Sequence, residues 1–546
     1  MTARPVSCLA VAALVCLGAA SAVSAQDDHQ HHGGASTRLG AVHFETSCSP
    51  AVAKTFDRGV ALLHSFWFSA AITTFDEVLA ADPNCVMARW GIALSWWGNP
   101  FAGIRSADAL KAGLAAVDAA KASGAGTERE KAYIAAVELL FRDASVKDQR
   151  SRTVAYEKAM EALSAKYADD VEARIFYALA LGQTALPSDK TYANQLKAAD
   201  ILEREFASQP DHPGLAHYII HSFDVPPLAP RALDAARRYA KIAPDAPHAL
   251  HMPSHTFTRV GLWQESIDAN LASAAAARKD NATAEELHAL DYQAYAYLQC
   301  AQDAKAKTTV DAIPALFPKI ATPGAGNAAP PAAGYYAAAA IPARYALERN
   351  AWDEAASLEI RESPVAWADA VTYFARALGA ARGGNPPSAK TAVEKLAALR
   401  DRLSAPNDAY WREQVEIERR GASAWIALAE GRTPEALTLM REAADMEDAT
   451  EKAPVTPGPI KPARELLGEM LLELQKPADA LVAFEATLVK EPNRFRAVYG
   501  AARAAEAAGD KEKAKKYYAA LLKIADHPST PPRKELAEAS RVASME

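Results

Sequence analysis

The sequence predicts an all-α fold, a right-handed α-solenoid built from pairs of antiparallel helices. Alanine-rich stretches with helical periodicity run through nearly the whole chain, whereas the alternation typical of β-strands is almost absent. His217 and His221 are followed 34 residues later by His251 and His255, and 34 residues is the period of a helix–turn–helix repeat. A chain of 546 residues exceeds one compact domain, but a solenoid escapes that limit because each repeat contacts only its neighbours.

Residues 1–25 predict a secretory signal peptide. Arg4 precedes an apolar run over residues 6–20, and small residues come just before a cleavage site at Gln26. No other run is long and apolar enough to span a membrane. We therefore expect an exported protein, periplasmic or secreted, without a membrane span. Residues 26–47 follow as a polar, flexible tail that contains several His and Asp residues.

Two helical blocks account for the rest of the chain. Residues 48–317 form an N-terminal block that holds the histidine cluster, and residues 335–546 form a C-terminal block. Residues 318–334, rich in Pro, Gly and Ala, predict a loop between the blocks, and residues 453–462 are a second Pro-rich break. Within both blocks, small and aromatic residues recur at spacings that pack helix pairs, as in Gly59, Ala71 and Phe75 and again in Gly468, Ala480 and Phe484.

The cysteines predict one disulfide. In an oxidising compartment Cys48 and Cys85 can bridge and hold the N-terminal segment against the first helix pair. Cys300 lies in an apolar helical stretch, where we expect a buried, inert thiol.

Four histidines are the main candidates for metal ligands. Residues four apart share a helix face, so His217 and His221 form one pair, and His251 and His255 form the matching pair one repeat later. Imidazole suits Zn, Cu and Fe, so we expect the four rings to converge on one transition metal. Pro253 disfavours helical geometry just before it, so a helix either starts or kinks there.

Other residues near these pairs are candidates of second rank. His248 and His288 lie at the edges of the same faces, and His64 lies on a helix of a distant repeat. Roles beside a metal or in acid–base chemistry are open to Tyr218, Asp224, Arg259, Asp291 and Tyr292. The alternative is that the histidines are polar groups on a solvated groove, or buried rings bonded to the backbone.

Five stretches carry a resemblance to known proteins: FDRGVALLHSFWFSAAITTFDEVLAADPNC, HPGLAHYIIHSFD, HALHMPSHTFTRVGLW, LHALDYQAYAYLQ and PVTPGPIKPARELLGE. Over most of residues 45–500 the chain resembles a group of bacterial exported tetratricopeptide repeat (TPR) proteins. The resemblance implies the solenoid fold and the importance of the histidine motifs HPGxxHxxxH and HMPxH. It implies no reaction.

Two classes of function follow from these observations. In a TPR solenoid the first helix of each pair lines a concave groove, so we expect a protein whose groove binds a protein, peptide or small molecule and holds a histidine-rich metal site. The alternative is a metal-dependent enzyme, hydrolytic or oxidative, in which three or four histidines leave one coordination position open. A net charge of −7 argues against a nucleic-acid partner, which usually meets a basic stripe.

Overall fold

The computed structural model describes residues 38–320 and 328–544, and all regular structure in them is helical. The first twelve α-helices have the following bounds: α1 Ala53–His64, α2 Phe68–Ala81, α3 Val86–Trp97, α4 Ala107–Ala122, α5 Glu128–Phe141, α6 Gln149–Lys166, α7 Val171–Thr184, α8 Ala193–Ser208, α9 Pro213–Ser222, α10 Leu233–Ile242, α11 Pro247–His251 and α12 Pro253–Arg259. The predicted signal peptide, residues 1–25, and the start of the predicted tail lie outside the described residues.

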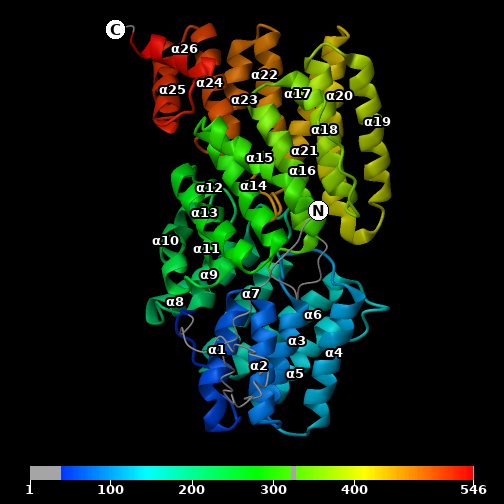
Figure 1. Ribbon diagram of the computed structural model, residues 1–546, viewed down its shortest axis with the longest axis vertical. Helices are drawn as coiled ribbons and strands as arrows, with labels where there is room; N and C mark the ends of the chain where they lie inside the picture. The colour runs from blue at the N-terminus through cyan, green and yellow to red at the C-terminus, as the bar shows by residue number, and fades with distance from the viewer. Residues whose placement is uncertain (1–37, 321–327, 545–546) are drawn as a thin grey trace, which may run out of the picture. The chain divides into compact units, whose positions relative to one another are not determined.

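The remaining α-helices continue to the C-terminus: α13 Trp263–Lys279, α14 Thr283–Gln299, α15 Asp303–Leu316, α16 Pro331–Glu348, α17 Trp352–Ala356, α18 Ala366–Arg382, α19 Pro386–Arg402, α20 Ala409–Ala429, α21 Thr433–Asp448, α22 Ala463–Glu473, α23 Pro477–Lys490, α24 Phe495–Ala507, α25 Lys511–Ile524 and α26 Lys534–Ala543. Most helices pack against the next one in the chain, and residues 38–544 belong to one compact unit (Figure 1). This all-helical succession of paired helices confirms the predicted α-solenoid class. No described helix is both long and apolar enough to cross a membrane.

The same packing of an aromatic ring between two glycines appears near both ends of the unit. The ring of Phe75 on α2 lies between Gly59 on α1 and Gly91 on α3, where an added Cβ would lie 2.6 Å and 2.3 Å from ring atoms. Near the C-terminus the ring of Phe484 lies between Gly468 and Gly500 in the same way, at 2.9 Å and 2.4 Å. The small residues thus let neighbouring helices approach closely enough to enclose an aromatic ring.

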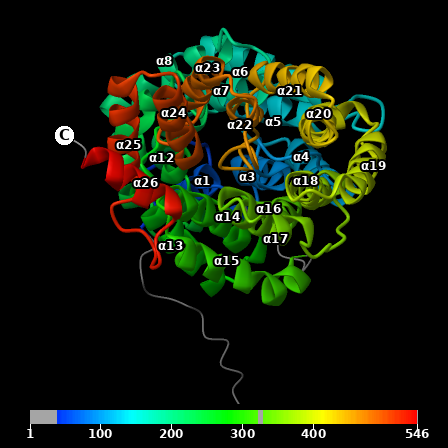
Figure 2. The same cartoon turned by 90° about the horizontal axis from the view of Figure 1, so that it is seen from above.

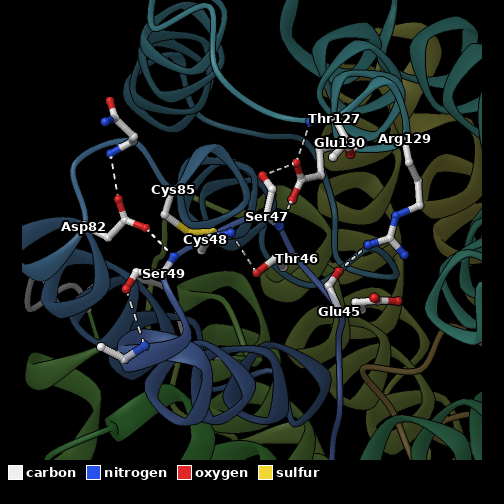
Figure 3. The surroundings of a disulfide bond; sticks show 12 residues. Glu45, Thr46, Ser47, Cys48, Ser49, Asp82, Cys85, Thr127, Arg129 and Glu130 are labelled. Carbon is white, nitrogen blue, oxygen red and sulfur yellow. Dashed lines mark hydrogen bonds between the residues drawn. A yellow bond between two sulfur atoms is a disulfide. The ribbon is translucent and has the colours of Figure 1, made fainter.

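The chain before α1 is packed on the helices from residue 38 onward, which differs from the flexible tail predicted for residues 26–47. Leu39 and Phe44 are buried, and Phe44 contacts three aromatic rings of the core. Cys48 and Cys85 form a disulfide, and Ser47 beside it donates to Glu130 on α5 (Figure 3). Apolar burial and these bonds together fix a segment whose polar composition suggested a free tail.

The two Pro-rich regions differ in their structure. In the first, predicted as a loop over residues 318–334, α16 already begins at Pro331, and residues 321–327 lie outside the described residues. The second lies within residues 449–462, called here the inner segment, which runs between α21 and α22. It packs beside α14 and α16 (Figure 1), and Figure 2 shows the helices surrounding the region that it enters.

Candidate metal centre

Six histidines gather where α9, α11, α12 and α14 meet. They fall into two groups of three, and within each group every residue offers one ring nitrogen that lies within 4.8 Å of the others. We call them the first triad (His217, His221 and His248) and the second triad (His251, His255 and His288). All are buried except His221, which is partly buried.

Each triad contains one of the two predicted pairs, so the structure differs from the predicted convergence of four rings on one point. The third member of each triad is His248 or His288, which the sequence placed at the edges of the same faces. Ring centroids lie 4.8 Å and 4.9 Å apart within the pairs, whereas those of His221 and His255, one repeat apart, are separated by 6.2 Å. His251 and His288, on different helices, lie closer still, with ring centroids 4.4 Å apart, so spacing along the chain and helix packing together assemble the triads.

The backbone path at Pro253 sets the geometry of the second triad. Met252, between α11 and α12, keeps helical backbone angles of φ −53° and ψ −36°, so the chain continues in a helical path across the proline. The N–H of His255 bonds to the carbonyl of Met252 at 3.1 Å. His251 and His255 therefore lie on one side, with their Nε2 atoms 3.0 Å apart.

Hydrogen bonds fix the protonation pattern of these two rings. Asn270 donates its amide N–H to the carbonyl of Ser266, so its Oδ1 faces His251 Nδ1, at 2.7 Å. His255 Nδ1 lies 2.9 Å from Asp224 Oδ2. Both oxygens can only accept, so both Nδ1 atoms donate, and each neutral ring carries a lone pair on Nε2. Two lone pairs therefore face each other across 3.0 Å.

The first triad presents bare nitrogens in a similar way. His217 donates from Nδ1 to the backbone carbonyl of His64 at 2.7 Å, which leaves its Nε2 as an acceptor. That Nε2, the Nε2 of His221 and both ring nitrogens of His248 have no hydrogen-bond partner among the described residues. Buried polar atoms without partners are costly, and three neighbouring imidazoles of this kind form a suitable ligand set for a metal.

His64 reaches the first triad through its backbone, while its ring belongs to a separate network. Its Nε2 donates to Glu172 at 2.9 Å, and its Nδ1 lies 2.9 Å from the Tyr218 hydroxyl. His212 Nε2 donates to the other oxygen of Glu172, while its Nδ1 accepts the N–H of Leu215 and caps α9. Every ring nitrogen here has a partner, so the network supports α9 and positions the carbonyl that orients His217.

Burial keeps the triad imidazoles neutral at pH 7. It lowers the pKa of His217 and of His288 to about 3, and it lowers the pKa of His221, His248 and His251 well below the usual range. The pKa of His255 is lowered too, because burial outweighs the opposing effect of Asp224.

Asp224 is the charged centre beside the second triad. It accepts from Arg259 Nε at 2.8 Å, from His255 and from Lys452 Nζ at 3.2 Å. Burial alone would raise the pKa of Asp224, but Lys452 and Arg259 outweigh this and hold it well below its usual range. Burial lowers the pKa of Lys452 to about 8. Neither Lys452, in the inner segment, nor Asn270 was predicted, since neither fits the spacing of the histidines: Asn270 lies 19 residues after His251, and Lys452 lies 228 residues after Asp224.

The remaining candidates hold neighbouring groups in place. The Tyr292 hydroxyl lies 3.3 Å from His255 Nδ1 and 3.1 Å from the carbonyls of Pro454 and Thr456. Asp291 instead accepts from Arg344 Nε at 2.9 Å. The five predicted neighbouring residues therefore have different positions. Asp224, Arg259 and Tyr292 border the second triad. Tyr218 contacts His217 and the ring of His64, and Asp291 pairs with α16.

A cavity of about 880 Å³ adjoins both triads. Each triad contributes two histidines to its wall, and the walls also include apolar, aromatic and charged side chains. Trp367 and Trp411 stack on one side with ring centroids 3.9 Å apart, and Lys452 and Asp224 lie on the side of the histidines. Apolar walls with a few polar groups are typical of small-molecule sites.

No family model matches this chain, and no curated protein matches it. Among solved structures, the TPR domain of P58(IPK) is similar at 15% identity, covering 67% of this chain and 98% of its own, with a TM-score of 0.21. Yeast Tom70 is similar at 12% identity, covering 90% of this chain and 95% of its own, with a TM-score of 0.27. Superpositions this loose add nothing to the helical repeat fold described above.

Proposed function

We propose that this chain is an exported protein that binds a transition metal through its histidine cluster and receives a small molecule in the adjoining cavity. The facing Nε2 atoms of His251 and His255 carry the proposal. Lone pairs 3.0 Å apart repel unless a cation lies between them. Metal–imidazole bonds of ~2.0–2.1 Å span such a gap. A proton is a poor substitute, because burial disfavours the charged form of both rings.

Imidazole suits zinc, copper and iron alike, so the charge of the buried site, rather than its donors, favours Cu(I). All six candidate ligands are neutral imidazoles, and the nearest carboxylate, that of Asp224, is already bonded to Arg259 and Lys452. A divalent ion would enter this buried site without a compensating charged ligand, whereas Cu(I) brings half the charge. Imidazole is also a suitable ligand for copper.

Two observations support the rest of the proposal. The Cys48–Cys85 disulfide fits an oxidising compartment, in keeping with the signal peptide predicted from the sequence. The inner segment occupies space beside α14 and α16, and the cavity next to the histidines is of a size for a small molecule. Because the inner segment fills this space, a protein or peptide partner would bind other surfaces of the repeats, which helical repeat scaffolds commonly offer.

Metal binding is tested on the mature, metal-free chain. Separate titrations with Cu(I) under anaerobic conditions, Zn(II) and Fe(II), followed by elemental analysis after desalting, should show retained copper. His255→Ala, which removes one of the facing nitrogens, should weaken retention, and the exposed His43→Ala serves as its matched control. Retention no higher than in a histidine-free control protein, or equal retention by wild type and His255→Ala, would contradict the proposal.

The second candidate is a metal-dependent enzyme, and the position of the cavity favours it. The histidines form part of the wall of a cavity that is large enough for an organic substrate. Turnover of aromatic or ester test substrates by the metal-loaded chain, lost in His255→Ala and retained in His43→Ala, would support oxidative or hydrolytic catalysis. Metal binding without turnover would support the binding function alone.

A further inference from the structure

The two triads repeat the same arrangement relative to the cavity. In each, two imidazoles border the cavity, His221 and His248 in the first and His255 and His288 in the second. The third member of each triad does not line the cavity and is anchored by its Nδ1, which donates to the backbone carbonyl of His64 or to Asn270.

Each triad is also a separate set of ligands. None of the metal-ligand groups found among the described residues mixes members of the two triads. Centroid distances do not separate the triads, since those of His248 and His251 lie 6.0 Å apart and those of His221 and His248 lie 6.4 Å apart, but three ring nitrogens within 4.8 Å of one another occur inside each triad. A single ion bonded at ~2.0–2.1 Å to each nitrogen reaches three rings of one triad more readily than rings drawn from both.

We propose that the site is dinuclear, with one ion held by the three imidazoles of each triad. This inference rests on the metal-binding function proposed above. Three imidazoles leave a coordination position unfilled on each ion. Since two histidines of each triad border the same cavity, one small anion or a dioxygen-sized molecule that enters the cavity could approach both ions. The anchored third ring of each triad, His217 or His251, holds the ions against the cavity wall.

The number of ions per chain tests this inference. The metal-free full chain is loaded with Cu(I) anaerobically, desalted and analysed for copper and protein. We expect two copper ions per wild-type chain, one in His217→Ala, one in His251→Ala and none in the double variant. His43→Ala is the matched control and should retain two. Circular dichroism verifies that each variant keeps its helices.

Three other results would each overturn the inference. One ion in wild type and none in either single variant indicates a single shared ion, which overturns the dinuclear site while the proposed function stands. No ion in wild type overturns both. Two ions in every variant place the copper elsewhere and also overturn both.

A second measurement needs no substitution. Wild type loaded with Cu(I), oxidised by ferricyanide and shown by elemental analysis to keep its copper, should after addition of azide give an electron paramagnetic resonance signal that accounts for less than half of that copper, because two Cu(II) ions that share a ligand couple their spins. A spin count equal to the total copper would refute a shared ligand position.

Discussion

Acidification tests whether the triad histidines are neutral in the folded protein. Burial lowers the pKa of His217 to about 3. The ordinary pKa of histidine is about 6.5, so below that pH the unfolded chain takes up a proton at this position while the folded chain does not. The free energy of unfolding therefore falls as the pH falls from about 6.5 toward 3. Between pH 7 and pH 5, His217 alone contributes a loss of about 2 kcal/mol.

The measurement is urea unfolding of the metal-free chain at pH 7, 6 and 5. His217→Ala lacks the titrating group, so between pH 7 and pH 5 it should lose about 2 kcal/mol less than wild type. The exposed His43→Ala is the control and should follow the wild-type curve. Equal losses in wild type and His217→Ala would show that His217 takes up its proton in the folded protein as well, which would refute the argument from burial.

Three further changes test the packing, the disulfide and the support of the site. Gly91→Ala places a Cβ 2.3 Å from the Phe75 ring and should cost about 1–3 kcal/mol in urea unfolding. The control Gly421→Ala, whose nearest neighbour is at 3.6 Å, should gain about 0.5–1 kcal/mol, and equal effects would contradict the packing role. Cys48→Ser should cost about 3–4 kcal/mol, because Cys48 and Cys85 are 37 residues apart, and unchanged stability would argue against the bond. Asn270→Leu removes the acceptor of His251 Nδ1 and should weaken copper binding about 10–100-fold. The control is Gln264→Leu at an exposed position of the same helix, which should leave copper binding unchanged.

Repeat spacing accounts for how much of the fold and site could be predicted. The 34-residue interval places α9 and the α11–α12 pair as neighbouring elements, and four-residue spacing gives each pair of rings a common side. The sequence also placed His248 and His288 at the edges of these faces. Local spacing thus indicates which imidazoles share a face, and the packing of α9, α11, α12 and α14 brings the six together.

The division into two triads could not be predicted in the same way. It depends on the backbone path through Met252 and on side-chain bonds to Asn270 and Asp224, which set the ring orientations. The sequence indicates only that Pro253 disturbs a helix. A helix that starts at Pro253 and a helix that kinks there would orient the His251 side chain differently. His64 shows the same limit, since its carbonyl acts on His217 while its ring bonds to Glu172.

The inner segment explains why these histidines are buried although groove residues of a repeat protein usually meet solvent. Its Lys452 contacts Asp224, its carbonyls at Pro454 and Thr456 approach the Tyr292 hydroxyl, and Arg344 bonds to its carbonyls at Gly458 and Pro459. Proline lacks an N–H, so a Pro-rich chain enters such a space with fewer donors to satisfy. The segment thereby covers the second triad and supplies a cation at its edge. Lys452 places a positive charge beside the second triad, so the metal-binding function proposed above would favour an ion of low charge there.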